Sequence, residues 1–509
     1  MRTSRKRALI SVYFKSGIEK IASALHKNDW EIISTGGTAS YLEDNSIPVT
    51  KVSEITGFPE ILGGRVKTIH PKIFGPILAE KSDKHLKELD QFSLTKIDLV
   101  IVNFYPFEEF LKKDADLQTM IEKIDIGGPS MVRAAAKNFK DTIVIVREDD
   151  YPIVEEKIIP GILTFSDRKK LSADAFSYTS YYDSLIANYL HEGDGFNREF
   201  LTIPGKNLLT TRYGENPHQN SSVFITDNRS PLKNLIQHHG KQLSYNNILD
   251  FSVVYDLTNQ FLNIDDNFCV ILKHQNPCGA ALHSDQSKAF EDALSGDPVS
   301  SFGGIVGFNK TVESSSAEKM SKMFLEVIIA PAFSDDSLKI LKRKKNIRLI
   351  EIKPGYLEKD HIKSIHGGFI IQEKDNFNKD LSDFDNKTSR KLTPKEKEDV
   401  SFGWKIIKYI KSNAILIVKD RKILGVGAGQ MSRIDSVNIA INKSGESIKG
   451  SVLLSDAFFP FSDSIETASE NGIKVIIEPG GSIKDDEVIN AAESLGLSLL
   501  FTGVRHFLH

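Results

Sequence analysis

Short apolar runs alternate with segments of helical spacing along residues 1–195. The pattern predicts four strands, at Ala8–Val12, Glu31–Ser34, Leu99–Asn103 and Thr142–Val146. It predicts helices between them at Gly17–Lys27, Thr38–Asn45 and Pro129–Asn138. Alternating strands and helices indicate an α/β domain, in which helices cover both faces of a parallel sheet. Ligands of such domains collect at the carboxyl ends of the strands.

A long helix is predicted from Asp167 to Leu190, with Ser166 as its N-cap, and the aperiodic stretch His191–Asn197 then indicates the main domain boundary. We therefore expect one domain over residues 1–195 and a second over 200–509. The second region is again mixed α/β. Its predicted strands are Phe268–Leu272, Ala414–Val418, Ile423–Val426, Ser451–Leu454 and Lys474–Ile477, and its predicted helices include Asp435–Ile441 and Asp485–Leu495. The highly charged span Glu373–Glu398 is interpreted as a surface insertion, and no fixed-period repeat is visible.

Composition narrows the class of protein. The 509 residues are 40% hydrophobic and 26% charged, typical of a globular protein with more than one core. A formal net charge of −3 provides no global field for nucleic acid or an anionic membrane. Two cysteines make no disulfide framework, and no apolar run approaches the ~18 residues of a membrane span. The short apolar run after the basic start does not fit a secretory signal, so we expect a cytoplasmic protein.

Several N-terminal loops have the composition of an anion site. Ser34-Thr35-Gly36-Gly37-Thr38 follows a predicted strand and opens a helix, where backbone amides and the helix N-terminus favour an oxyanion. The stretch from Gly63 to Thr68 adds Arg65, which suits phosphate, and Lys67, which can lie beside a developing oxyanion. Each loop alone also fits an ordinary turn.

Asn103-Phe104-Tyr105 leaves a predicted strand end, and Asp125 precedes a Gly-Gly turn. Lys137 is predicted to lie one to two turns into the helix beyond, and an aspartate and a lysine brought together can share acid and base duties if burial or coupling moves their pKa values. Taken singly, the two residues also fit a helix cap and a solvated lysine.

The second region carries a different cluster. Lys273-His274-Gln275-Asn276-Pro277-Cys278 emerges from a predicted strand, and we interpret it as a polar cluster on a proline-fixed turn. A histidine directly after a lysine can act as a neutral general base beside an oxyanion-stabilising ammonium. A purely structural histidine is the alternative. Cys278 is interpreted as a small buried thiol.

These motifs together resemble a known family. TGGT, TGFPE, ILGGRVKT, NFYPF and IDIGG with RAAAKN resemble its cyclohydrolase half. RYGENPHQ, LKHxNPCG, SSFGG, EVIIAP, GxGAGQxSR, SDAFFPF and the terminal RxFxH resemble its formyltransferase half. The chain is thus similar, over essentially its whole length, to the phosphoribosylaminoimidazolecarboxamide formyltransferase / IMP cyclohydrolase family. The resemblance implies a methylglyoxal synthase-like parallel-sheet domain, followed by a larger mixed α/β transformylase region with cytidine deaminase-like subdomains.

For the cyclohydrolase half, the resemblance implies closure of the formylated ribotide (FAICAR) to inosine monophosphate (IMP) with loss of water. It assigns nucleotide binding to Ser11, Lys15, Thr35, Gly36, Gly37, Thr38, Arg65 and Thr68. Asn103, Tyr105, Asp125 and Gly127 would line the reacting base, with Lys67, Lys137, Asp125 and Tyr105 as the catalytic set. One departure puts the first loop in doubt: Tyr13-Phe14 replaces the family's small polar pair, although a backbone amide there could still serve.

For the formyltransferase half, the resemblance implies transfer of a formyl group from 10-formyltetrahydrofolate to aminoimidazole carboxamide ribotide (AICAR). His274 would accept the amine proton and Lys273 would stabilise the charge. The implied substrate contacts are Arg212, Tyr213, Phe302, Gly303, Glu326, Asn413, Arg433, Phe458, Asp463 and Arg505. It further implies no catalytic metal, and a homodimer that shares the transfer site.

Two rival functions stay open at this point. In one, the N-terminal domain is a nucleotide-binding regulatory module, for which the Tyr13-Phe14 pair is the sole argument. In the other, the basic runs Arg2–Arg7 and Lys342–Lys345 bind nucleic acid, which the near-neutral net charge argues against.

Overall fold

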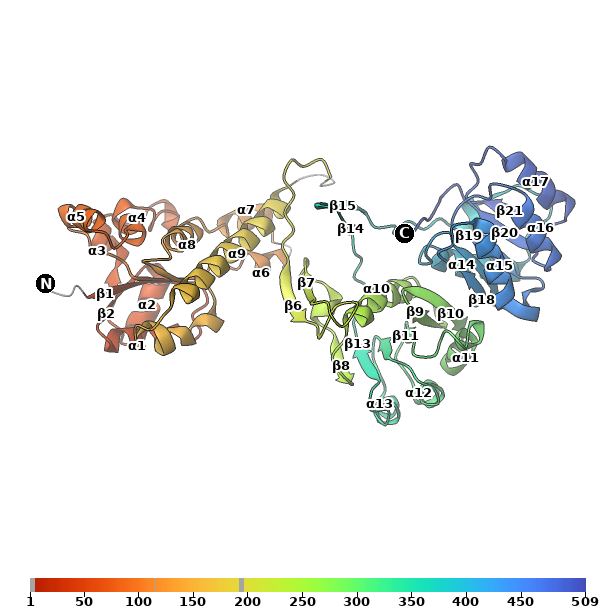
Figure 1. The fold of residues 1–509 in the computed structure, drawn as a ribbon, viewed down its shortest axis with the longest axis horizontal. Helices are drawn as coiled ribbons and strands as arrows, with labels where there is room; N and C mark the ends of the chain where they lie inside the picture. The colour runs from red at the N-terminus through yellow and green to blue at the C-terminus, as the bar shows by residue number, and fades with distance from the viewer. Residues whose placement is uncertain (1–4, 114, 192–195) are drawn as a thin grey trace. The chain divides into compact units, whose positions relative to one another are not determined.

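The computed structural model describes residues 5–113, 115–191 and 196–509 (Figure 1). The chain separates into two compact units, residues 1–206 with 226–228, and residues 207–225 with 229–509. Part of the predicted boundary stretch His191–Asn197, residues 192–195, lies outside the described residues, as do residues 2–4 of the basic run Arg2–Arg7.

The first unit contains the predicted parallel sheet. Its five strands run in the order β3-β2-β1-β4-β5, and every neighbouring pair is parallel. The strands are β1 (Lys6–Ser11), β2 (Trp30–Ser34), β3 (Thr50–Lys51), β4 (Leu99–Val102) and β5 (Ile143–Ile145). The strand order reverses between β1 and β4. The carboxyl ends of these two strands are therefore where a ligand crevice is expected.

Helices cover both faces of this sheet, because successive strand residues point to opposite sides. Leu9, Val100 and Val144 belong to the core under α8 and α9, whereas Ile10 and Ile101 belong to the core under α1. The helices of the unit are α1 (Ile18–Lys27), α2 (Gly36–Asp44), α3 (Val52–Thr56), α4 (Pro71–Leu78), α5 (Asp83–Gln91), α6 (Phe107–Leu111), α7 (Leu117–Glu122), α8 (Gly127–Lys137) and α9 (Phe165–Leu190).

The predicted N-cap of the long helix α9 is wrong by two residues. Thr164 caps the helix and forms a reciprocal capping box with Asp167, which is a stronger arrangement than a lone serine at position 166.

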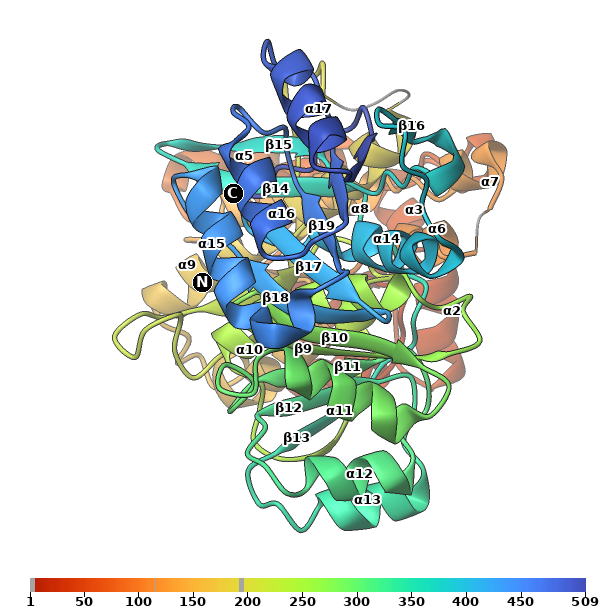
Figure 2. The same cartoon turned by 90° about the vertical axis from the view of Figure 1, so that its right-hand side faces the viewer.

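The second unit is built on one 12-stranded mixed sheet. Its order is β16-β21-β20-β19-β17-β18-β10-β9-β11-β12-β13-β8. The strands are β8 (Ile236–His239), β9 (Asn267–Lys273), β10 (Asn276–His283), β11 (Ile305–Phe308), β12 (Val327–Ala330), β13 (Arg348–Glu351), β16 (Asp385–Asn386), β17 (Ile415–Lys419), β18 (Lys422–Gly427), β19 (Val452–Ser455), β20 (Val475–Glu478) and β21 (Ser498–Phe501). Strands β8 to β13 lie side by side in one half of this sheet, and strands β16 to β21 lie side by side in the other half (Figure 2).

This sheet contains a structural repeat that the sequence analysis did not find. Each half begins with an edge strand and a helix, α10 (Tyr245–Asn259) or α14 (Pro394–Ile407). A hairpin follows, β9–β10 or β17–β18, and then three more parallel strands whose first member pairs with the hairpin. The connecting helices are α11 (Gln286–Gly296), α12 (Ser314–Met320) and α13 (Asp335–Leu341) in one half, and α15 (Arg433–Ser444), α16 (Asp463–Glu470) and α17 (Asp485–Ser494) in the other. The halves meet through an antiparallel contact of β10 with β18.

The charged span Glu373–Glu398 is not merely a surface insertion. It contains β16, which closes one edge of the large sheet against β21, and the start of α14, where Glu396 is buried. Burial is possible because Arg390 and the capping residue Thr393 satisfy the Glu396 carboxylate. Two small sheets complete the unit, β6 (Lys206–Thr210) with β7 (Ser222–Ile225), and β14 (Asp360–Ile365) with β15 (Gly368–Glu373). No described helix is long and apolar enough to span a membrane.

Candidate active sites

The first candidate site lies at the carboxyl ends of β1 and β4, as the strand order predicts. The loop after β1 is folded back by Asn103, whose side-chain oxygen accepts the amides of Tyr13 at 2.6 Å and Phe14 at 3.2 Å. These amides are therefore already bonded, and Asn103 positions the loop. The ring of Tyr13 lies edge-on to Tyr105, with centroids 5.6 Å apart, so the departure from the family motif forms one wall of the site.

Lys67 belongs to the glycine-containing stretch Gly63–Thr68, and its ammonium lies next to the other glycine turn, Ser34–Thr38. A Cβ atom on Gly36 would lie 3.4 Å from the Lys67 Nζ, and Gly36 has a positive φ of 48°. The sequence analysis missed Glu60, which lies 3.4 Å from the Thr35 hydroxyl and is also close to both turns. Glu60 stands in the TGFPE motif, which gave no signal that it would reach the anion-binding turn.

Asp125 is held by hydrogen bonds on both its side chain and its backbone. Its carboxylate accepts the Gly128 amide at 2.8 Å, and its own amide donates to the Tyr182 hydroxyl oxygen at 2.8 Å. Burial raises the pKa of Asp125, although the amides of Gly128 and Tyr105 and the nearby Lys67 ammonium act to lower it. The environment thus makes Asp125 a better proton acceptor than an exposed carboxylate.

Thr68 closes the other side of the site. A Cβ on Gly127 would lie 2.5 Å from the Thr68 Oγ1, so only glycine allows this approach. The structure thus brings Lys67, Thr68 and Gly127 together with Asp125.

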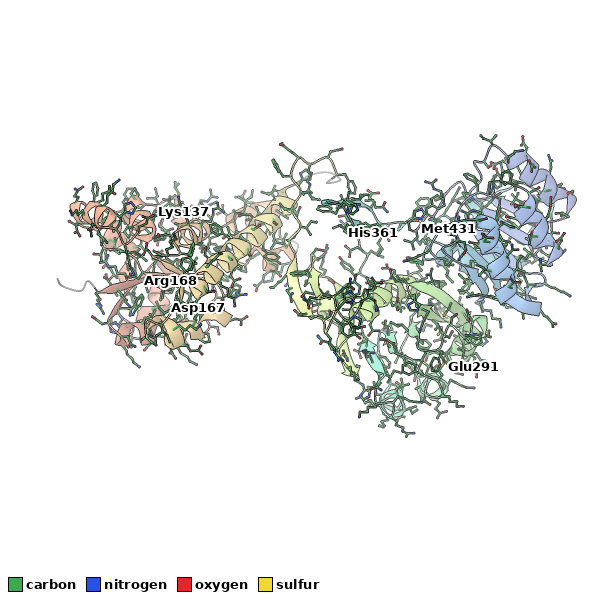
Figure 3. All side chains as sticks on the ribbon, in the orientation of Figure 1. Lys137, Asp167, Arg168, Glu291, His361 and Met431 are labelled. Atoms are coloured by element: carbon green, nitrogen blue, oxygen red, sulfur yellow. The ribbon has the colours of Figure 1, made fainter. Side chains whose placement is uncertain are left out.

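Lys137 does not join this cluster, and its predicted place one to two turns into the helix is wrong. Lys137 is exposed at the C-terminal end of α8 (Figure 3). Asp125 lies just before the start of that helix. Eleven helical residues separate them by about 15 Å of rise. The guanidinium of Arg65, predicted to bind phosphate, instead forms an ion pair with Glu122 at the exposed surface. Ser11, Lys15 and Thr38 flank the first loop, where the Thr38 hydroxyl bonds Val12.

The second candidate site is organised by the β9–β10 hairpin. The turn consists of His274 and Gln275, both with positive φ (52° and 63°), and Lys273 pairs directly with Asn276 across it. The interpretation as a proline-fixed turn is wrong: Pro277 lies within β10, beside a register shift. A turn of two left-handed residues usually contains Asn or Gly, so His-Gln is an unfavourable choice that requires external support.

Lys273 faces the SSFGG loop. Its Nζ donates to the carbonyls of Phe302 and Gly303, at 3.0 Å each. Gly303 has a φ of 69°, and a Cβ there would lie 3.2 Å from both the Lys273 Nζ and the Phe324 ring. The structure thus brings Lys273, Phe302 and Gly303 together.

Asp250 is a site residue that the sequence analysis missed. It lies on α10, and its Oδ1 accepts the Gln275 amide at 2.7 Å. Burial raises the pKa of Asp250, an effect opposed by that amide and by the nearby His274 and Lys273 side chains. Glu326 also lies in this electrostatic environment and accepts the Asn247 side-chain amide at 2.8 Å. The sequence analysis predicted no helix at α10, so Asp250 gave no signal of its own.

Asn413 and Arg433 form a buried network in the second half of the sheet. Arg433 donates to the Asn413 side-chain oxygen at 2.7 Å and pairs with the fully buried Asp456. Asn276 connects this region to the hairpin, since its side-chain oxygen accepts the Lys411 amide at 3.0 Å. Arg433 therefore lies where it orients Asn413.

Four of the remaining predicted contacts have side chains that reach solvent, namely Arg212, Tyr213, Phe458 and Arg505. The Arg212 guanidinium lies over the Tyr213 ring, and the Arg505 guanidinium lies over the ring of Phe507. Asp463 begins α16. No group of three or more His, Cys, Asp or Glu side chains among the described residues could hold a metal ion. Cys278 is half-buried, and burial raises the pKa of its thiol, in keeping with an inert residue.

The fold and these two sites define a two-part enzyme, with a parallel-sheet domain joined to a larger duplicated α/β unit. Residues 17–130 match the family profile described as "MGS-like domain", and residues 135–443 match "AICARFT/IMPCHase bienzyme". The chain belongs to the AICARFT/IMPCHase bienzyme family. Both the expected fold class and the expected bifunctional formyltransferase and cyclohydrolase of purine biosynthesis are confirmed.

Relatives cover the whole chain. A protein of Caldicellulosiruptor saccharolyticus described as "Bifunctional purine biosynthesis protein PurH" is 46% identical over 99% of this chain and 100% of its own length. Proteins with the same description from Persephonella marina and Aquifex aeolicus are each 45% identical, again over 99% of this chain and 100% of theirs.

Proposed function

We propose that the two sites catalyse consecutive steps, with formyl transfer in the second unit and ring closure in the first. In the first step the 5-amino group of AICAR attacks the formyl carbon of 10-formyltetrahydrofolate, giving FAICAR and tetrahydrofolate. In the second step the carboxamide nitrogen of FAICAR attacks the formyl carbon, and loss of water gives IMP. The coarser conclusion, a family that uses a formyl-folate and small-molecule substrates, follows from membership itself.

The observation that carries the transfer assignment is the strained His274–Gln275 turn, with Lys273 directly before it. His274 takes the amine proton as the new C–N bond forms, and the folate nitrogen leaves as the tetrahedral intermediate collapses. The Lys273 ammonium, held by two carbonyls on the SSFGG loop, stabilises the oxyanion of that intermediate. Phe302, Gly303, Phe458 and Asp463 then contact the folate or the reacting groups, and Arg212, Tyr213, Asn413 and Arg505 contact the ribotide.

Ring closure is supported by the Lys67–Asp125 pair. Asp125, whose pKa burial raises, accepts the proton of the attacking carboxamide nitrogen. Lys67 stabilises the oxyanion formed at the former formyl oxygen, which leaves as water. Tyr105 and Gly127 line the base. A catalytic role for Lys137 stays a prediction. Within a single subunit, that role would involve no contact between Lys137 and Asp125.

The proposal extends to the state of the protein: a cytoplasmic homodimer that binds neither nucleic acid nor membrane and requires no catalytic metal. The two domains divide near residue 195. Sedimentation velocity tests the dimer, and mixing two variants inactive in transfer tests whether the site is shared.

Assays with isolated substrates separate the two activities. Protein given AICAR and 10-formyltetrahydrofolate should produce IMP, and protein given FAICAR alone should do the same. A regulatory N-terminal unit would bind FAICAR without forming product, which would overturn the cyclohydrolase assignment.

A further inference from the structure

The structural repeat provides an internal comparison for the His274 turn. The equivalent turn of the second half, between β17 and β18, consists of Asp420 and Arg421, and each has a φ of 56°. Both hairpins therefore have two left-handed residues at their tips, and neither contains glycine. Left-handed backbone in such residues is unfavourable unless the surroundings hold it in place.

The same support exists in both halves. The Asp250 Oδ1 accepts the amide of the second turn residue, Gln275, at 2.7 Å, and the Asp399 Oδ1 accepts the amide of Arg421 at 2.6 Å. Asp250 and Asp399 are each the sixth residue of their helices, α10 and α14. The bond is thus a property of the repeated fold, in which a helix carboxylate holds the hairpin tip.

What differs between the halves is the group at the tip. In the second half, Asp420 pairs with Lys395, and Arg421 pairs with Asp266 at 2.6 Å, so both side chains are in ion pairs. In the first half the corresponding positions carry His274 and Gln275, and the preceding Lys273 reaches the carbonyls of Phe302 and Gly303. Only the first tip presents an imidazole, beside an ammonium that is directed at the SSFGG loop.

We propose that Asp250 is a positioning residue for formyl transfer, which fixes His274 by holding the Gln275 amide. The inference rests on the proposed function of the second unit. The bond sets the backbone of the turn, and the backbone of the turn sets the direction of the His274 ring relative to Lys273. Asp399 makes the same bond at a tip that carries no histidine and whose two side chains are in ion pairs.

The decisive comparison is Asp250→Ala with Asp399→Ala in the full-length protein. Asp250→Ala is expected to lower kcat for formyl transfer about 100-fold through misplacement of the base, with little change in KM for AICAR. Asp399→Ala removes an equivalent bond and should leave that kcat unchanged. Asp250→Asn keeps an oxygen that accepts the amide and should restore most of the rate. The far-UV circular dichroism spectrum and the thermal unfolding midpoint of each variant report whether the second unit, which contains both aspartates, is folded.

A second measurement addresses variants that fold poorly. Gln275→Gly removes the penalty for a left-handed residue, so Asp250→Ala should cost less kcat in that background than in the wild type. Wild-type kcat in Asp250→Ala, an equal loss in Asp399→Ala, no rescue by Asn, or no coupling to Gln275→Gly would each overturn the proposal.

Amide exchange separates this inference from the proposed function. Residues 274–276 should exchange faster in Asp250→Ala, and unchanged exchange would overturn the inference even in an active enzyme. If the wild-type protein transferred no formyl group, the proposed function would fail, and the exchange result would then decide only whether Asp250 holds the turn.

Discussion

The ammonium of Lys273 donates to the carbonyl of Gly303 at 3.0 Å, and Gly303 itself adopts a φ of 69°. A Cβ at this position would lie 3.2 Å from the Lys273 Nζ and equally close to Phe324. The glycine therefore serves two purposes: it permits the left-handed backbone and leaves room for the ammonium.

Gly303→Ala should lower kcat for formyl transfer about tenfold or more, because the ammonium must move away from the oxyanion position. Steady-state formylation of AICAR measures the effect. Gly450→Ala is the control, since Gly450 has a φ of 76° and open space around its Cβ position. Equal activity of the two variants would show that the Lys273–Gly303 contact has no part in transfer.

Asp125→Asn should slow conversion of FAICAR to IMP by about 100-fold or more, because the amide cannot accept the carboxamide proton. Formyl transfer, measured in the same preparation, should persist. Asp90→Asn, at an exposed carboxylate of the same unit, should affect neither step. A fully active Asp125→Asn variant would remove Asp125 from the mechanism.

Glu478 makes stability depend on pH. It is buried at the end of β20, accepts the Phe459 amide at 2.6 Å, and its other oxygen has no partner. Burial raises its pKa to about 8. Because the folded form binds the proton more tightly than the unfolded form, stability is fully present below about pH 4.5 and is lost as the pH rises through about 8.

The loss amounts to at most about 1.4 kcal/mol per pH unit within that window. Glu478→Gln should therefore unfold at a higher denaturant concentration than the wild type at pH 8.5, with the difference shrinking toward pH 5. Glu470→Gln, on an exposed residue of α16, should follow the wild-type curve at both pH values. Parallel curves for wild type and Glu478→Gln would contradict the assignment.

The ion pair of Arg433 with Asp456 predicts a large cost for removing one partner. Both side chains are almost wholly buried, so Asp456→Asn leaves a guanidinium without its counter-charge. We expect a loss of about 3–5 kcal/mol in the free energy of unfolding, measured by denaturant titration. A loss below about 1 kcal/mol, the usual value for a surface pair, would mean that water reaches Arg433.

The sequence was informative where burial produces a long apolar pattern. The predicted strand Phe268–Leu272 lies within β9, and Lys474–Ile477 overlaps β20, because both are central strands with both faces covered. The sequence analysis did not predict the short edge strands. Strand β16, for example, has only two residues inside a charged span, and its position depends on pairing with β21.

Some of the site residues could likewise be predicted from the sequence, and others could not. Lys273 and His274 could be found from their place at a strand end, whereas their turn could not, since His-Gln lacks the Asn-Gly composition of such hairpins. Asp250 acts from another element, 25 residues away in sequence. The predicted helix Pro129–Asn138 ends within one residue of α8, so the sequence already implied that Lys137 lies at the far end of the helix from Asp125.

The central claim, two sites that act in sequence, is tested most directly by analysing the products of His274→Ala and Lys67→Ala given AICAR and 10-formyltetrahydrofolate. We predict that His274→Ala makes neither FAICAR nor IMP yet still converts added FAICAR, and that Lys67→Ala accumulates FAICAR. Loss of the same step in both variants would contradict the account.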